Sequence, residues 1–154
     1  ADKDIIQYLQ YNMRSQMFAK SLPMLMVKGA LKRLDMLRTM PELKAKLWEN
    51  VDALQNGLKE NGFNIGKTNT CVTPVFLEGD IPEAMAMVND LRENYGIFCS
   101  IVVYPVIPKG LIILRLIPTT THTLEDVKIT IESFSAIREK LEKGIYKRIA
   151  ASMI

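Results

Sequence analysis

The chain has 154 residues, a net charge of +3 and 48% hydrophobic residues, which suits about one globular domain with a sizeable core. This mild charge does not by itself indicate a nucleic-acid partner, and no apolar run approaches the roughly 18 residues of a membrane span. The two cysteines, Cys71 and Cys99, give neither a disulfide framework nor a metal-ligand spacing, so a reducing cytoplasm is the expected setting.

Two helices are expected before residue 39. Apolar residues recur at helical spacing over residues 4–13 and again over residues 23–38. The stretch 14–23 between them breaks this pattern and is interpreted as a loop or a short extended piece.

A third helix is expected from Thr39 to about Asn61. Thr39 followed by Glu42 has the spacing of a capping box, and Gly62 is a plausible stop signal. The apolar stripe predicted for this helix consists of Leu43, Leu47, Val51, Leu54 and Leu58.

The second half of the chain alternates between strand and helix patterns. Strands are expected over residues 71–79, 96–103 and 111–117, and helices over 80–95 and 123–143. Pro74 favours an edge or a bulge for the first strand. The order, three helices and then β-α-β-β-α, predicts an α+β fold with a small, mainly antiparallel sheet of about three strands covered by helices.

Arg115 is the most informative residue of the third strand. Strand alternation places it on the face of Leu111, Ile113 and Ile117, and both faces of this strand are apolar. A guanidinium here could bind a carboxylate through two parallel hydrogen bonds. Alternatively, Arg115 lies on an edge strand, with its stem packed and its head in solvent, and the residues alone favour this second interpretation.

Two loops flank the third strand. The stretch after it could line a polar site at a helix N-terminus, or it could be ordinary loop around the N-cap Thr123. The preceding loop, YPVIPKG at 104–110, is stiffened by two prolines and could shape a pocket mouth or simply join two strands. The chain contains no phosphate-binding glycine loop, H-E-x-x-H or G-x-S-x-G motif, so a self-contained catalytic set is not expected.

The stretches GIFCSIVVYPVIPKGLIILRLIPTTTHTLEDV and YLQYNMRSQMFAKSLP resemble the C-terminal domain of the α-oxoamine synthases. These are pyridoxal-phosphate (PLP) enzymes of aminotransferase fold type I that condense an amino acid with an acyl-CoA. The family pattern is a glycine-started strand, a Y-P-x-V-P loop, a strand bearing Arg, and an A-H-T or T-H-T turn into the last helix. The resemblance implies an aminotransferase class I/II small domain, with residues 1–40 as a helical segment leading to a large domain and 41–154 as the α+β core.

The resemblance also implies roles for individual residues. The family's arginine at the position of Arg115 binds the α-carboxylate of the substrate. Active-site loops would be formed by Tyr104, Pro105, Pro118, Thr119, Thr120, Thr121 and His122. In a homodimer, the cofactor phosphate of the other subunit would be reached from the segment of Phe18, Ala19 and Ser21. Ala19 replaces the family's serine, so the backbone N–H or Ser21 would have to supply that contact.

Other features of the family would lie outside this chain. The Schiff-base lysine, the aspartate at the pyridine nitrogen and the stacking histidine would precede Ala1, so the chain is expected to be part of a longer enzyme and inactive alone. The 104–110 loop resembles glycine C-acetyltransferases (2-amino-3-ketobutyrate CoA ligases), whereas NMRS and the T-H-T turn resemble serine palmitoyltransferases. The expected ligands are PLP, glycine or serine, and an acyl-CoA. The alternative is a stand-alone ferredoxin-like module that binds a ligand or a protein without catalysis.

Overall fold

The computed structural model describes residues 1–151, which fall into two compact units, residues 1–40 and the remainder. The first unit contains α1 (Lys3–Asn12), α2 (Arg14–Met17) and α3 (Met24–Thr39), and none of their residues is buried. The helices expected over 4–13 and 23–38 are confirmed. The expectation of a loop throughout 14–23 is wrong at its start, because a single helical turn is too short to show an apolar period.

The capping box predicted at Thr39 and Glu42 is also wrong. Thr39 is the last residue of α3, and its hydroxyl donates to the carbonyl oxygen of Asp35 at 2.9 Å. The next helix starts at Pro41. Proline suits the first helical turn and disfavours the helical conformation in the residue before it, and Met40 accordingly has φ −123° and ψ 68°. The break between the helices therefore lies at Met40.

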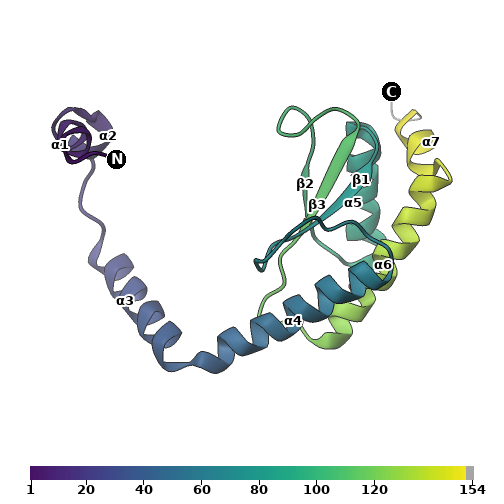
Figure 1. The fold of residues 1–154 in the computed structure, drawn as a ribbon, viewed down its shortest axis with the longest axis horizontal. Helices are drawn as coiled ribbons and strands as arrows, with labels where there is room; N and C mark the ends of the chain where they lie inside the picture. The colour runs from purple at the N-terminus through teal and green to yellow at the C-terminus, as the bar shows by residue number, and fades with distance from the viewer. Residues whose placement is uncertain (152–154) are drawn as a thin grey trace. The chain divides into compact units, whose positions relative to one another are not determined.

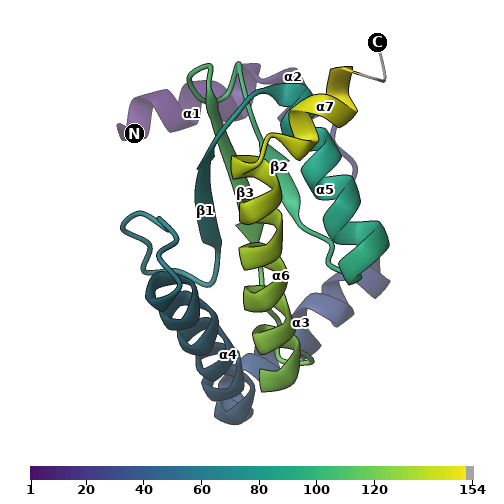
Figure 2. The ribbon, with the colours of Figure 1, turned by 90° about the vertical axis from the view of Figure 1, so that its right-hand side faces the viewer.

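The second unit is a three-stranded antiparallel sheet with helices on one face (Figures 1 and 2). Its elements are α4 (Pro41–Glu60), β1 (Thr73–Glu78), α5 (Ile81–Tyr95), β2 (Ser100–Val102), β3 (Leu111–Leu116), α6 (Leu124–Glu142) and α7 (Ile145–Ala151). The strand order is β1-β3-β2, and β3 pairs antiparallel with both neighbours. The predicted α+β class and sheet size are confirmed, and Pro74 lies on an edge strand as expected.

Two glycines end helices, and one of them moves the expected start of a strand. Gly96 has φ +67° and ends α5, so the residues that follow it are not yet strand, and β2 begins only at Ser100. Gly144 has φ +64° and separates α7 from α6. Because glycine adopts this left-handed conformation without a steric penalty, both positions end a helix abruptly.

The hydrophobic core lies between the sheet and the helices. Figure 2 shows α4, α6 and α5 side by side in front of the sheet. Residues of the covered sheet face alternate with exposed ones along β3. The core includes Leu54, Leu58, Val75, Met87, Leu91, Ile112, Leu114, Leu116, Val127, Phe134 and Ile137. The stripe predicted for α4 is buried at its C-terminal half and half-buried at Leu43 and Leu47.

Candidate carboxylate-binding site

Arg115 lies on the central strand β3, on the sheet face that α4–α7 leave uncovered. Alternation along β3 buries Ile112 and Leu114 under the helices and exposes Leu111 and Arg115. Arg115 therefore shares a face with Leu111 and Ile113, as predicted. The interpretation of Arg115 as an edge-strand residue is wrong, since β3 is flanked by both other strands.

The guanidinium of Arg115 is held on one side only. Its Nε donates to the hydroxyl oxygen of Ser100 at 3.1 Å, and Ser100 is its cross-strand neighbour on β2. Among residues 1–151, no carboxylate forms an ion pair with Arg115. With Nε occupied by Ser100, the two terminal nitrogens form the edge that can bind a carboxylate end-on through two parallel hydrogen bonds.

Residues 118–122 form a compact turn directly after β3. The backbone N–H of Thr119 donates to Nδ1 of His122 at 2.9 Å, and the N–H of His122 donates to the carbonyl oxygen of Thr119 at 3.3 Å. The hydroxyl oxygens of Thr119 and Thr121 are 2.8 Å apart. Pro118 is buried and Thr120 is half-buried, whereas the other turn residues are exposed. Because Nδ1 of His122 accepts a hydrogen bond, the neutral imidazole carries its proton on Nε2.

The end of this turn is fixed by the N-cap of α6. The hydroxyl of Thr123 accepts from the N–H of Asp126 at 3.1 Å, and the carboxylate of Asp126 accepts from the N–H of Thr123 at 2.7 Å. The Asp126 carboxylate also accepts from the Thr123 hydroxyl at 2.8 Å. The hydrogen bonds that this carboxylate accepts from the Thr123 backbone and side chain hold the pKa of Asp126 below its usual value. The N-cap predicted at Thr123 is confirmed, and it completes a capping box.

Sequence reasoning missed Asn50, which supports the turn from behind. Asn50 lies on α4 and is fully buried. Its Nδ2 donates to the carbonyl oxygen of Thr119 at 2.9 Å and to that of His122 at 2.8 Å. One feature of the sequence could have indicated Asn50. It lies next to Val51 and three residues after Leu47, at the side of the buried stripe of α4, and a buried polar side chain there requires a hydrogen-bond partner.

The two loops expected to form one site lie at opposite ends of β3. Val102 pairs with Ile113, so Tyr104 and Pro105 follow beyond the Leu111 end of the strand. That end is roughly 14 Å from Arg115, at about 3.4 Å per residue. The structure therefore brings Arg115 together with Ser100, and it places the 118–122 turn and the pair Tyr104 and Pro105 beyond opposite ends of β3.

Each loop borders a small cavity. Pro118 and His122 line a cavity of about 320 Å³ whose other walls are mostly apolar and come from α4, α6, the end of β3 and residues 95–98. Tyr104 lines a separate cavity of about 240 Å³ together with Lys109, whose Nζ lies 5.1 Å from the centroid of the tyrosine ring. Arg115 lines neither cavity, so a carboxylate would approach it across the uncovered sheet face.

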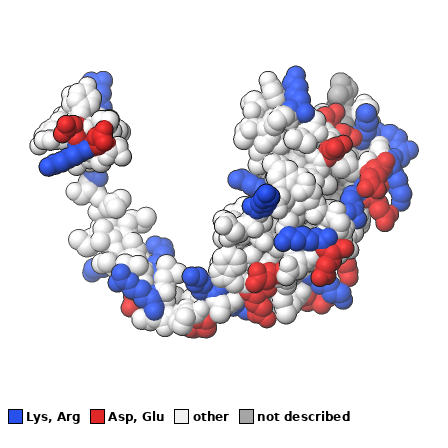
Figure 3. All heavy atoms as spheres, viewed as in Figure 1, with Lys and Arg blue, Asp and Glu red and all other residues white. Residues whose placement is uncertain are grey.

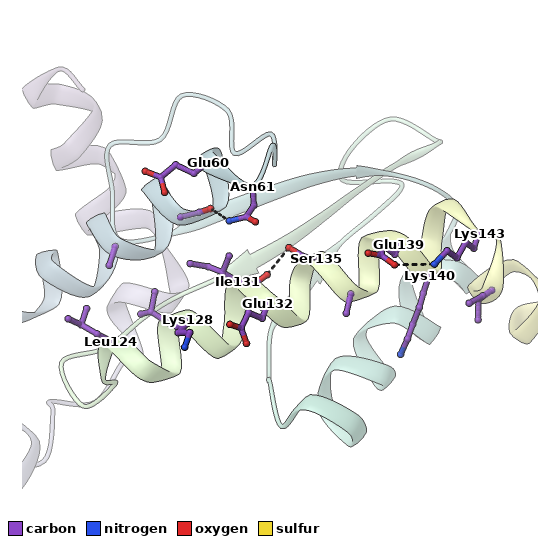
Figure 4. A pocket seen from close by; sticks show the side chains of 15 residues that line it. Glu60, Asn61, Leu124, Lys128, Ile131, Glu132, Ser135, Glu139, Lys140 and Lys143 are labelled. Atoms are coloured by element: carbon purple, nitrogen blue, oxygen red, sulfur yellow. Dashed lines mark hydrogen bonds and ion pairs between the residues drawn. The ribbon is translucent and has the colours of Figure 1, made fainter.

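A larger groove of about 1030 Å³ lies between α4, α6 and the start of α7 and includes no strand residue (Figure 4). Two of its lysines form ion pairs. Lys143 binds Glu139 at 3.0 Å, and Lys140 binds Asp90 of α5 at 2.7 Å. Figure 4 shows Lys140 extending from α6 toward α5 and away from the end of α4. This groove is therefore separate from the Arg115 site.

The surface charges do not form a patch of one sign on the face shown in Figure 3. Lysine, arginine and acidic residues intermingle there, above all over α6 and α7. No helix among residues 1–151 has both the length and the hydropathy needed to cross a bilayer.

Comparison with known proteins identifies the family. Residues 1–134 match the model of the family described as aminotransferase class I and II. The chain belongs to this family. The match covers the helical segment, the sheet and most of α6, including Arg115 and the 118–122 turn. The expected aminotransferase class I/II type is thereby confirmed.

Relatives of this aminotransferase-family chain support the α-oxoamine synthase resemblance. A cysteate-C-fatty acyltransferase from Capnocytophaga ochracea is 73% identical over 149 residues, which are 97% of this chain and 36% of the relative. A serine palmitoyltransferase from Sphingobacterium spiritivorum is 30% identical over 141 residues, 92% of this chain and 35% of the relative. A solved serine palmitoyltransferase superposes with a TM-score of 0.77 at 28% identity, covering 88% of this chain and 37% of the other. The chain thus spans little more than a third of the length of these relatives.

The residues beside Arg115 fit an amino-acid substrate better than a covalently bound cofactor. None of the three strands contains a lysine, so the sheet face offers no amine for a Schiff base. It offers a guanidinium that forms no ion pair with an acidic residue in the described part of the chain. This donor set suits a carboxylate ligand, and a PLP Schiff base would need a lysine from outside these strands.

Proposed function

We propose that the protein carrying this chain is a PLP-dependent acyl-CoA:amino-acid C-acyltransferase, and that this chain supplies its substrate-carboxylate residue, Arg115. One observation carries the proposal: the Arg115 guanidinium is fixed through Nε by Ser100, while its terminal nitrogens have no anionic partner among residues 1–151. An uncompensated, oriented arginine is what recognition of a planar carboxylate requires.

The relatives favour cysteate as the amino acid and a fatty acyl-CoA as the acyl donor. The relative that is 73% identical is named a cysteate-C-fatty acyltransferase, whereas the serine palmitoyltransferases are near 30% identity. This refines the expectation of glycine or serine. Serine is the second candidate, because the serine palmitoyltransferases match both in sequence and in fold.

Arg115 would act by orientation. Its guanidinium would hold the carboxylate by charge as well as by hydrogen bonds. Two parallel hydrogen bonds fix the plane of the carboxylate, and with it the direction of the Cα–H bond that must be broken. PLP, when bound, supplies the electron-withdrawing group on which this deprotonation depends.

The exposed segment 18–21 is proposed to contact the cofactor phosphate of a second subunit in a cytoplasmic homodimer. Phe18 is 74% exposed, and Ala19 and Ser21 are exposed as well. An aromatic side chain this exposed suits a segment that packs against another surface. Contact with the phosphate would come from the Ala19 backbone or from the hydroxyl of Ser21.

The test uses the full-length protein that contains this chain, loaded with PLP. Cysteate, L-serine and glycine are titrated while the cofactor absorbance is recorded, with the parent protein and with Arg115→Ala and Arg115→Lys. We expect cysteate to bind most tightly and Arg115→Ala to weaken binding about 100-fold, from the loss of a charge-assisted bidentate contact. Arg115→Lys should recover only part of this loss, because an ammonium lacks the planar fork.

The matched control is Arg92→Ala. Arg92 is an exposed arginine of α5 that pairs with Glu93 and lies outside the three strands. Its replacement should leave amino-acid binding unchanged. Binding by Arg115→Ala within twofold of the parent protein would overturn the proposed role of Arg115.

A further inference from the structure

Asn50 is a buried side chain of α4 that binds the turn after β3 through two hydrogen bonds from the same nitrogen. Its contacts to the carbonyl oxygens of Thr119 and His122 span 69 and 72 residues of sequence. These two carbonyls belong to the second and the last residue of the turn that also holds the His122 ring. A single amide group therefore ties both residues to α4.

The other half of this amide has no partner. Oδ1 of Asn50 is a buried acceptor without a hydrogen bond among the described residues. A buried acceptor left unpaired lowers stability, so an apolar residue at this position would remove that cost. Asn50 nevertheless occupies this position and makes two donor contacts to the turn. We take this to indicate that its role is to hold the shape of the turn.

We propose that Asn50 is a positioning residue for the amino-acid site: by clamping the turn 118–122 it fixes the segment that follows Arg115 at the end of β3 and thereby raises the affinity for the amino-acid substrate. This inference rests on the proposed function. The turn begins three residues after Arg115, and the connecting chain is anchored in the core by the buried Leu116 and Pro118.

Loss of the clamp has a defined local consequence. Without the Asn50 N–H groups, the carbonyls of Thr119 and His122 lose their inward donors and turn toward water. The Thr119 N–H then no longer meets Nδ1 of His122, and the imidazole loses both its tautomer and its orientation. Arg115 itself keeps its contact to Ser100, so catalysis would be impaired through substrate affinity rather than abolished.

Gln55 provides a matched control on the same helix. It is also a buried amide of α4, and its Nε2 donates twice, to the carbonyl oxygen of Thr70 at 3.0 Å and to the hydroxyl of Thr73 at 3.1 Å. Its partners lie before and at the start of β1 instead of in the turn. Gln55→Ala therefore removes a comparable buried amide while leaving the turn clamped.

The experiment compares Asn50→Ala and Gln55→Ala in the full-length, PLP-loaded protein. Hydrogen–deuterium exchange of the peptide covering residues 117–123 reports the turn directly, and steady-state kinetics separate KM for the amino acid from KM for the acyl-CoA. We expect Asn50→Ala to speed exchange in this peptide and to raise KM for the amino acid about tenfold, with KM for the acyl-CoA within about twofold. Gln55→Ala should change neither the exchange of that peptide nor KM for the amino acid.

Equal effects of the two variants on KM for the amino acid would overturn the proposal, because both would then report general destabilisation. If Asn50→Ala does not fold, Asn50→Ser is the variant to test. Its hydroxyl can donate to only one of the two carbonyls, so KM for the amino acid should rise by an intermediate amount. Failure of the proposed function is recognised separately, by amino-acid binding that does not depend on Arg115. In that case the exchange measurement still tests the clamp.

Discussion

Replacing Ser100 with alanine removes the side-chain acceptor that holds Nε of Arg115. The contact is charge-assisted, and such hydrogen bonds contribute about 1.5–3 kcal/mol when well shielded. Arg115 is exposed and Ser100 is only half-buried, so solvent screening reduces the contribution to about 1 kcal/mol. If this energy orients the guanidinium for the substrate, Ser100→Ala should weaken amino-acid binding about fivefold.

The assay is the titration of the PLP-loaded full-length protein with cysteate, performed on a double-mutant cycle. Ser100→Ala should weaken binding in the parent background and have no further effect in Arg115→Ala, because Ser100 would act only through Arg115. Ser135→Ala is the control, since the Ser135 hydroxyl donates to the Ile131 carbonyl at 3.1 Å within α6. Equal weakening by Ser100→Ala in both backgrounds would refute the orienting role.

The remaining predictions concern the stability of the chain, measured by urea denaturation. Burial raises the pKa of Asp90, but hydrogen bonds from Lys140 and Tyr146 outweigh it and hold the pKa below its usual value near 4. The resulting stabilisation is present above about pH 4 and is lost as the pH falls through the lowered pKa. Between about pH 7 and pH 3, the free energy of unfolding should therefore fall less for Asp90→Asn than for the parent protein. Phe134→Ala should lower the free energy of unfolding by about 3–5 kcal/mol, because the ring is fully buried, and a loss below about 1 kcal/mol would contradict its place in the core. Thr123→Ala should cost about 1 kcal/mol through loss of the N-cap of α6, and an unchanged urea midpoint would argue against that cap.

The face on which Arg115 lies could be predicted because it depends only on the twofold period of a strand. That period placed Arg115 with Leu111 and Ile113 without knowledge of any partner strand. The position of β3 in the centre of the sheet depends on which strands pair, and one strand's residues do not contain this information. For this reason the interpretation as an edge-strand arginine failed while the assignment of its face was confirmed.

Element boundaries were predicted wrongly where two local sequence signals pointed to different boundaries. Thr39 has the spacing of an N-cap, but Pro41 disfavours helical geometry at Met40, and the helix starts at Pro41. Likewise, Gly96 fits the start of a strand and also the left-handed end of a helix, and the second role prevails. Each choice depends on the backbone conformation of one residue, which composition does not determine.

The supporting residues of the site were the hardest to predict. Asn50 and Ser100 are ordinary polar residues until their partners are known. The contacts of Asn50 span about 70 residues of sequence, and Ser100 meets Arg115 only through the strand register. The resemblance to the α-oxoamine synthases indicated Arg115 and the turn, but it gave no reason to single out the side chains that hold them.

The most direct test of the account is a crystal structure of the full-length protein with PLP and cysteate bound. We predict that both terminal nitrogens of Arg115 lie within about 2.7–3.1 Å of the two α-carboxylate oxygens, with Nε still donating to Ser100. An α-carboxylate bound by other residues, with Arg115 in solvent or paired to an acidic side chain, would contradict the central claim.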